Sequence, residues 1–339
     1  MTHFRSPLTY RLLVASTFSF LLILTGCDNA QTAPTAGAAH SDAQKGWPRT
    51  VQTSKGALTL QHPPERIVST SVTLTGTLLA INAPLIGSGA TSRNSTVSDE
   101  QGFFTQWGAV ARQRHLKPLY TTEPDAEAIA AQAPDLIIIS ATGGDSALKL
   151  YDQLSTIAPT LVIDYGDKSW QQLATELGKA IGHEADAREA ITGFEQRVSS
   201  VKRAITLPPQ PVSALVYYGD GRGVNLWTTA SAQGQLLNEL GFTLAALPAD
   251  LQGGSSMGKR SDIIQLSGEN MASGITGQTM LLFSATDKTV AGVESNPFLA
   301  HLPSVSAKRV YAMGADTFRL DYYSASNMLD TIARQFKTP

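Results

Sequence analysis

The sequence predicts an α/β protein of two parallel-sheet lobes that are joined by a single long connector helix, with a ligand cleft between the lobes. The chain has 339 residues, which is enough for two domains of roughly 150 residues each. Short apolar runs alternate with helical segments in both halves, as in sheets that helices cover on both faces. Apolar residues make up 42% of the chain and charged residues 16%, so a sizeable core can form.

The first lobe is expected over residues 47–183. Its strand candidates are short apolar runs, and Pro134 stops the helix that precedes the most apolar of them. After residue 88 we expect a long polar loop. The expected strands are 67–70, 85–88, 136–139 and 161–163, and the expected helices are 72–82, 124–133 and 145–158.

The connector helix is expected over residues 184–207. Apolar residues recur there at helical spacing, no proline interrupts them before Pro208, and Gly193 is the only glycine. The second lobe follows over residues 208–339. Its expected strands are 214–217, 280–283 and 309–312, and its closing helix is 322–336. Ligands of such lobes lie at the carboxyl ends of the strands, so the loops after the strands should line the cleft.

The N-terminus predicts an exported lipoprotein. A positively charged start precedes an apolar run over residues 12–24, which is too short to span a bilayer and is typical of a signal peptide. The run leads into the sequence LTGC, which ends at Cys27 and resembles the lipobox of bacterial lipoproteins. We therefore expect a signal peptide over residues 1–26, lipidation of Cys27 and a flexible tether over residues 27–46. Asp28 resembles the signal that retains such proteins in the inner membrane, which predicts a tethered periplasmic protein.

Charge and composition exclude several classes of function. The 26 basic and 28 acidic side chains nearly cancel, so binding to nucleic acid through a basic surface is not expected. One cysteine cannot form a disulfide framework, and the six histidines include no H-x-x-x-H pair. We therefore expect no metal site built from cysteine or histidine.

Three glycine-containing motifs are open to more than one interpretation. Residues 254–258 read GSSMG and match the nucleophile elbow, with Ser256 as nucleophile, but a loop precedes them where the elbow requires an apolar strand. Gly143 and Gly144 follow a strand without the lysine of a phosphate-binding loop, so a tight strand-to-helix turn is expected. Residues 219–223 lack dinucleotide spacing and are expected to form a mobile turn.

Basic and aromatic side chains gather on the loops that should face the cleft. Arginine offers fixed donors to oxyanions and stacks on aromatic rings, so the expected ligand is both anionic and aromatic. The basic residues are Arg93, Arg222, Lys259, Arg260 and Arg319, and the aromatic residues are Tyr165, Tyr218, Trp227, Tyr322 and Tyr323.

Four stretches resemble the helix-hinged substrate-binding proteins of ABC importers, and among these the members that bind ferric enterobactin. The resemblance extends from about Trp47 to the C-terminus. It implies a binding protein rather than an enzyme, acting as a monomer with an inner-membrane permease. The four stretches are residues 65–76, 134–145, 258–266 and 318–324.

The same resemblance implies the ligand and the contact residues. The ligand would be a ferric tris-catecholate, a trianion whose iron is already fully coordinated, so the protein would supply no metal ligand. Arg260 and Arg319 would contact catecholate oxygens and Trp227 would stack on a ring. The full set of expected ligand contacts is Arg93, Tyr218, Trp227, Lys259, Arg260, Arg319 and Tyr322.

The resemblance also implies one exposed glutamate in each lobe that meets arginines of the permease. Glu127 and Glu269 are the matching positions, each in the first turn of an expected helix. A first-turn carboxylate also complements the helix dipole, and the local pattern does not separate the two roles. Two other functions stay open: the same fold with haem, cobalamin or a ferric hydroxamate as cargo, and a lipid-anchored serine esterase that uses Ser256.

Overall fold

The first lobe is organised around a five-stranded parallel sheet with strand order β5-β4-β3-β6-β7. The computed structural model describes residues 46–220, 222–248, 251 and 261–338. All five residues of β6 are buried, as expected for a central strand that is covered on both faces. The strands are β3 (Ile67–Ser69), β4 (Leu85–Ala90), β5 (Lys117–Thr121), β6 (Leu136–Ser140) and β7 (Thr160–Ile163).

Side-chain capping explains where two helices of this lobe begin. The hydroxyl of Ser71 accepts a hydrogen bond from the Leu74 backbone N–H at the start of α2, and Ser169 forms a capping box with Gln172 at the start of α6. The expected helix over residues 145–158 is shorter and divided in two. The helices are α2 (Val72–Ala80), α3 (Thr105–Gln113), α4 (Ala126–Ala130), the 3₁₀ turn η1 (Leu148–Leu150), α5 (Tyr151–Ser155) and α6 (Trp170–Ile181).

The expected long polar loop after β4 contains two regular elements, α3 and β5. Strand β5 has the sequence KPLYT and pairs only with β4, so Pro118 is tolerated because the strand lies at the sheet edge. An antiparallel hairpin of β1 (Arg49–Thr53) and β2 (Gly56–Leu60) also precedes the sheet. These elements are missed from the sequence because few apolar residues recur in them at a regular period.

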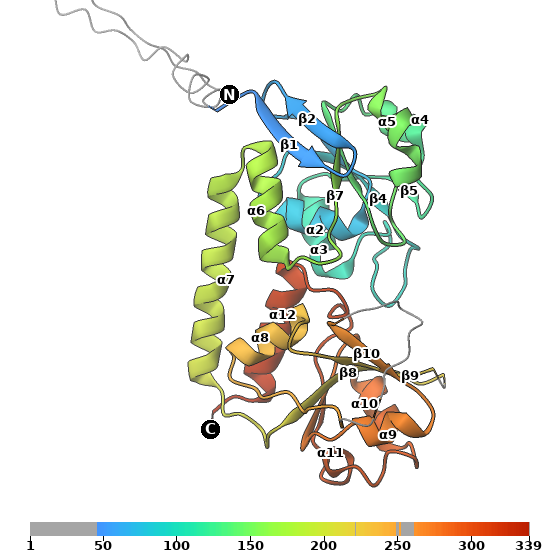
Figure 1. Cartoon of the computed structure of the whole chain (residues 1–339), viewed down its shortest axis with the longest axis vertical. Coiled ribbons are helices and arrows are strands. Elements are labelled where there is room, and N and C mark those ends of the chain that lie inside the picture. Colours follow the sequence, from blue (N-terminus) through green and yellow to red (C-terminus); the bar gives the residue numbers. More distant parts are fainter. Residues whose placement is uncertain (1–45, 221, 249–250, 252–260, 339) are drawn as a thin grey trace, which may run out of the picture. The chain divides into compact units, whose positions relative to one another are not determined.

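The long helix α7 runs from Glu184 to Ala204. It is separated from α6 by Gly182, which adopts a left-handed conformation with φ of 88°. Its buried residues are Ala187, Phe194 and Val198, which form one narrow stripe. With this stripe α7 packs against α6 of the first lobe and against α12 (Tyr322–Gln335) of the second lobe (Figure 1).

The second lobe has a five-stranded sheet with order β10-β9-β8-β11-β12. Strands β8, β11 and β12 are parallel, whereas β9 is antiparallel to both of its neighbours, β8 and β10. The strands are β8 (Val212–Tyr218), β9 (Gly223–Trp227), β10 (Ile263–Leu266), β11 (Thr279–Leu282) and β12 (Val310–Ala312). The other helices are α8 (Ala232–Glu239), α9 (Glu269–Gly274), α10 (Asp287–Glu294) and α11 (Pro303–Ser306).

The predicted fold class, two α/β lobes joined by a long helix, is confirmed, with one difference in the second sheet. The sequence predicts parallel strands in this lobe, whereas β9 and β10 were not predicted and β9 is antiparallel to both of its neighbours. Because only a short turn separates β8 from β9, the two strands must run in opposite directions.

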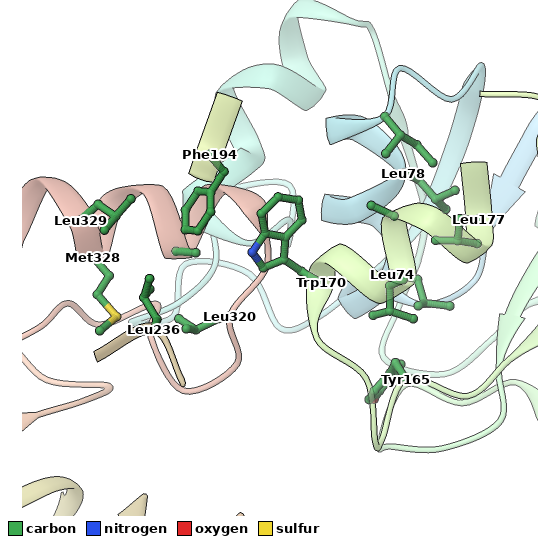
Figure 2. Close-up of a cluster of buried hydrophobic side chains, with 14 of the residues drawn as sticks. Leu74, Leu78, Tyr165, Trp170, Leu177, Phe194, Leu236, Leu320, Met328 and Leu329 are labelled. Atoms are coloured by element: carbon green, nitrogen blue, oxygen red, sulfur yellow. The ribbon is translucent and has the colours of Figure 1, made fainter. Parts of the chain in front are cut away.

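One hydrophobic cluster connects the two lobes (Figure 2). Trp170 of α6 meets Phe194 of α7 and Tyr322 of α12, with ring centroids 5.2 Å and 5.4 Å apart. The same cluster includes Leu74 of α2 and Met328 of α12. The lobes therefore share buried apolar surface, which restrains their relative motion. In the part of the chain that the structure describes, no helix combines the length and the apolar character needed to cross a bilayer.

Candidate functional site

A cleft of about 780 Å³ is lined by loops of both lobes. This volume falls in the usual range for small-molecule sites, about 300–1,000 Å³. As expected, several of its walls follow strands. The lining consists of residues 165–169 after β7, Trp227 at the end of β9, residues 230–233 and Gln235 around the start of α8, residues 261–262 before β10, residues 318–320 before α12, and Gln172 of α6.

Of the basic side chains in the described lining of this cleft, Arg319 is the one best placed to bind an anionic ligand. Its side chain is exposed, and its guanidinium carbon lies 4.3 Å from the centre of the Tyr165 ring. Among the described residues no carboxylate forms an ion pair with it. Lys168 also lines the cleft, but its Nζ lies 3.2 Å from Asp167 Oδ1 and donates to the Asp164 carbonyl oxygen at 2.8 Å. The guanidinium of Arg319 therefore remains free to meet an anion.

Trp227 and Phe318 form an aromatic wall. Their rings meet edge to face with centroids 5.6 Å apart, and Trp227 is only 6% exposed whereas Phe318 is 37% exposed. The indole Nε1 of Trp227 is buried without a hydrogen-bond partner among the described residues. Gln233 of α8 donates to the carbonyl oxygens of Thr317 and Phe318, at 3.1 Å and 2.7 Å. This pair of bonds holds the segment that carries Phe318 and Arg319 against α8.

Tyr165 connects Arg319 to the first lobe. Its hydroxyl donates to Asp145 Oδ1 at 2.8 Å. Burial, and after it the charge of the Asp145 carboxylate, raises the pKa of Tyr165 to about 12. The hydroxyl therefore stays protonated near neutral pH and keeps its role as a donor.

The structure brings some of the expected contact residues to the cleft and leaves others away from it. Trp227 and Arg319 line the cleft. Arg93, Tyr218 and Tyr322 are not part of its lining. Lys259 and Arg260 lie outside the described residues, as does the esterase candidate Ser256.

Packing explains why Tyr218 and Tyr322 lie elsewhere. Tyr218 is covered by the Arg222 guanidinium, 4.3 Å from its ring centre, and its hydroxyl accepts a hydrogen bond from Asn225 at 2.9 Å. Tyr322 is the first residue of α12 and packs on Trp170 in the shared core. Arg93 is exposed in the loop after β4.

Several cleft residues were not among the predicted contacts: Tyr165, Lys168, Gln233 and Phe318. Tyr165 was expected on a loop that faces the cleft but was not named as a contact. Lys168 also follows β7, so the rule that ligands lie at the carboxyl ends of strands could have found it. Phe318 adjoins Arg319 in the sequence. No sequence signal points to Gln233, because its role depends on tertiary contact with residues 317–318.

Comparison with known families agrees with this geometry. A family model of periplasmic binding proteins matches residues 67–317. The chain belongs to this family. The ferric enterobactin-binding periplasmic protein FepB of Escherichia coli O6:H1 is 59% identical over 290 residues, which cover 86% of this chain and 91% of that protein. The Fe(3+) dicitrate-binding periplasmic protein FecB of Escherichia coli strain K12 is 26% identical over 209 residues, or 59% of this chain and 63% of that protein. Both relatives are named as binding proteins rather than enzymes.

Solved structures support the fold. The structure of holo-ViuP is similar with a TM-score of 0.76 and 36% identity, covering 86% of this chain and 96% of that chain. Staphylococcus aureus SirA complexed with staphyloferrin B has a TM-score of 0.61 and 20% identity, covering 84% and 96% of the two chains. At that identity the second comparison speaks for the fold alone.

Proposed function

We propose that this chain is the substrate-binding component of an ABC importer and that it captures ferric enterobactin, or a similar ferric catecholate siderophore, in the periplasm. The observation that carries the proposal is the cleft, where the Arg319 guanidinium is not occupied by a carboxylate among the described residues and the wall of Trp227 and Phe318 is aromatic. The identity of 59% with a ferric enterobactin-binding protein supports the same cargo.

The chemistry of the cargo fits this cleft. A ferric tris-catecholate is a trianion with aromatic rings at its surface, and its iron needs no ligand from the protein. Charge-assisted hydrogen bonds contribute about 1.5–3 kcal/mol each and cation–π contacts about 0.5–2 kcal/mol. Several such contacts in a preorganised cleft would reach nanomolar affinity, about −12 kcal/mol.

We propose that the protein needs no cofactor of its own, since the iron arrives inside the ligand. Within the described residues, no group of three or more His, Cys, Asp and Glu side chains is arranged to hold a metal ion. No specific observation favours the esterase hypothesis, because Ser256 lies outside the described residues and the chain's family is one of binding proteins.

Tryptophan fluorescence tests the cargo, because Trp227 lines the cleft. Ferric enterobactin should quench the fluorescence of the wild-type protein with nanomolar affinity, whereas a ferric hydroxamate and haem should bind far more weakly.

Arg319→Ala should weaken binding by about 1–3 kcal/mol, and Arg319→Lys should restore only part of the lost affinity because lysine lacks the planar fork. Arg334→Ala, at an exposed position of α12 away from the cleft, is the matched control. Equal affinity for the hydroxamate, or no loss in Arg319→Ala, would reject the catecholate assignment.

We propose that an inner-membrane ABC permease receives the cargo and that Glu127 and Glu269 meet it. Glu127 is exposed in the first turn of α4, after the N-cap Asp125. Glu269 is the first residue of α9. The two positions belong to different lobes, so a partner that contacts both would sense both lobes at once.

We propose that acylated Cys27, which lies outside the described residues, tethers the protein to the inner membrane. Cys27→Ser should abolish labelling with radioactive palmitate and release the mature protein into the soluble periplasmic fraction. A variant that stays membrane-bound after a high-salt wash would show that something other than a lipid holds the protein there.

A further inference from the structure

We infer that Tyr165 is a positioning residue for Arg319. The Tyr165 ring packs against the guanidinium, and the hydrogen bond from its hydroxyl to Asp145 fixes the ring in place. The ligand would then meet a cation whose position is set before binding. This inference rests on the proposed function, in which Arg319 binds an anionic ligand.

The first step is the contact between the two side chains. The Arg319 guanidinium carbon lies 4.3 Å from the centre of the Tyr165 ring, well within the range of a cation–π contact. Arg319 precedes α12 of the second lobe and Tyr165 follows β7 of the first. An exposed arginine loses rotamer freedom when a ligand immobilises it, and a ring that already holds the guanidinium reduces this loss.

The second step is the anchor of the ring. The Tyr165 hydroxyl donates to Asp145 Oδ1 at 2.8 Å. Asp145 Oδ2 in turn accepts hydrogen bonds from the Ser71 hydroxyl at 2.6 Å and from the Thr73 backbone N–H at 3.0 Å. Ser71 is the N-cap of α2, so the carboxylate lies at the positive end of a helix dipole. A rigid chain of contacts therefore leads from α2 through Asp145 and Tyr165 to Arg319.

The third step is the backbone that makes room for the anchor. Gly143 has a φ of 89°, and a Cβ at this position would overlap the Tyr165 hydroxyl and come within 3.0 Å of Asp145 Oδ1. At the neighbouring Gly144 a Cβ would meet no atom within 4 Å. The turn after β6 therefore leaves space for the Tyr165 hydroxyl at Gly143, whereas Gly144 does not face this hydroxyl.

The position of the pair in the cleft agrees with this role. Tyr165 and Arg319 line the large cleft and also a smaller cavity of about 30 Å³. One face of the guanidinium meets the Tyr165 ring. A ligand in the large cleft would therefore meet an arginine that already packs on an aromatic ring.

A double-mutant cycle separates positioning from a general structural role. Tyr165→Leu should weaken ferric enterobactin binding about tenfold in the wild-type background and by less than about twofold in the Arg319→Ala background. Tyr165→Phe keeps the ring and should lose less than Tyr165→Leu. Tyr151→Leu removes the ring under Lys55, a pair outside the cleft lining, and should leave binding unchanged. Equal losses for Tyr165→Leu in both backgrounds would overturn the inference.

A measurement on the unliganded protein tests the inference independently of the cargo. The Arg319 Hε proton, assigned with Arg319→Lys, should show an upfield ring-current shift and low side-chain mobility in NMR spectra. Both should be lost in Tyr165→Leu. Gly143→Ala should also disturb this signal, whereas Gly144→Ala should leave it unchanged. These two variants test the inference even if Tyr165→Leu does not fold. A signal that Tyr165→Leu and Gly143→Ala both leave unchanged would reject the positioning role. If the wild-type protein shows the signal but does not bind ferric enterobactin, the proposed cargo fails and the positioning role stands.

Discussion

Asp321 is a buried carboxylate at a contact between the two lobes. Its Oδ1 accepts a hydrogen bond from the Ser324 backbone N–H at 2.8 Å, and its Oδ2 accepts one from Gln106 of α3 at 3.3 Å. Gly76 of α2 leaves room for it, because a Cβ there would come within 2.5 Å of Asp321 Oδ2. Burial raises the pKa of Asp321 from 3.8 to about 6, although its hydrogen bonds act in the opposite direction.

This shift predicts that the free energy of unfolding depends on the charge of Asp321. Between pH of about 4 and 6 the carboxyl group is ionised in the unfolded chain but protonated in the folded one. The folded state then binds more protons, so the stability contributed by this group is complete below pH 4 and is lost as the pH rises through 6. A shift of about two pK units corresponds to about 3 kcal/mol.

Asp321→Asn should remove this dependence. Asparagine caps a helix as well as aspartate does, and its amide group can donate to Gln106 Oε1, which has no partner among the described residues. The variant should therefore gain stability relative to the wild type by about 3 kcal/mol between pH 4 and pH 7, measured by urea unfolding. Asp125→Asn, at the exposed N-cap of α4, controls for the change of capping residue. A difference that is the same at both pH values would contradict the prediction.

The backbone positions that border the cleft were easier to predict than side-chain directions. Trp227 and Arg319 line the cleft as expected, because strand ends locate the cleft along the backbone. Tyr322 was expected there for the same reason, but Asp321 caps α12 and the first helical turn places the Tyr322 ring on Trp170. Which face of a loop or helix end meets the ligand depends on packing between segments far apart in the sequence, and no local pattern records it.

At the scale of single elements, Gly182 determines where α6 ends and α7 begins. It adopts φ of 88° and ψ of 18°, and its N–H bonds the carbonyl oxygen of Gly178 at 2.9 Å. This left-handed conformation is the usual helix C-terminus for glycine. A side chain there would be strained, and its Cβ would come within 3.3 Å of the Trp47 ring.

Two glycine-to-alanine changes should therefore have opposite effects on stability. Gly182→Ala should lower the free energy of unfolding by about 1–2 kcal/mol because of the left-handed backbone. Gly193 lies within α7, and a Cβ there meets nothing within 4 Å, so Gly193→Ala should raise stability by up to about 1 kcal/mol. Chemical unfolding of both variants measures the effects. Two changes of the same sign would show that local backbone conformation does not decide the outcome.

The elements that the sequence predicted are those whose side chains follow a clear period. Strand β6 is a continuous apolar run, and α7 has apolar residues at helical spacing, so both were located closely. Helix α3 and strand β5 lie in a polar stretch, and the period of their apolar residues is too weak to predict them. Strand β9 was missed because Gly223 and Asn225 interrupt its apolar residues, and it is stabilised by pairing with β8 and β10 rather than by its own propensity.

At the scale of the whole molecule, the lobes are held together in more than one way. Besides α7 and the shared hydrophobic cluster, the C-terminal segment returns to the end of α7. The Thr206 N–H bonds the Phe336 carbonyl oxygen at 2.8 Å, and the Thr338 N–H bonds that of Ala204 at 3.1 Å. Lobes that are restrained in this way keep a nearly fixed spacing. A permease that contacts Glu127 of one lobe and Glu269 of the other would then engage both with little loss of conformational entropy.

A double charge reversal tests this arrangement. If Glu127 and Glu269 serve only their helix dipoles, replacing them costs about 0.3–1 kcal/mol of stability each and leaves transport intact. If they meet cationic residues of the permease, the variant with both Glu127→Arg and Glu269→Arg should bind ferric enterobactin normally. It should fail to stimulate permease ATPase activity in liposomes, because electrostatic steering and the register of docking are lost.

The control variant with both Glu189→Arg and Glu195→Arg changes the net charge equally on the exposed surface of α7 and should stimulate ATPase activity like the wild type. The defect should also be larger at low salt than at physiological salt, since ions screen the electrostatic steering that charge reversal inverts. Normal stimulation by the Glu127 and Glu269 double variant at both salt concentrations would assign the two carboxylates to their helices alone.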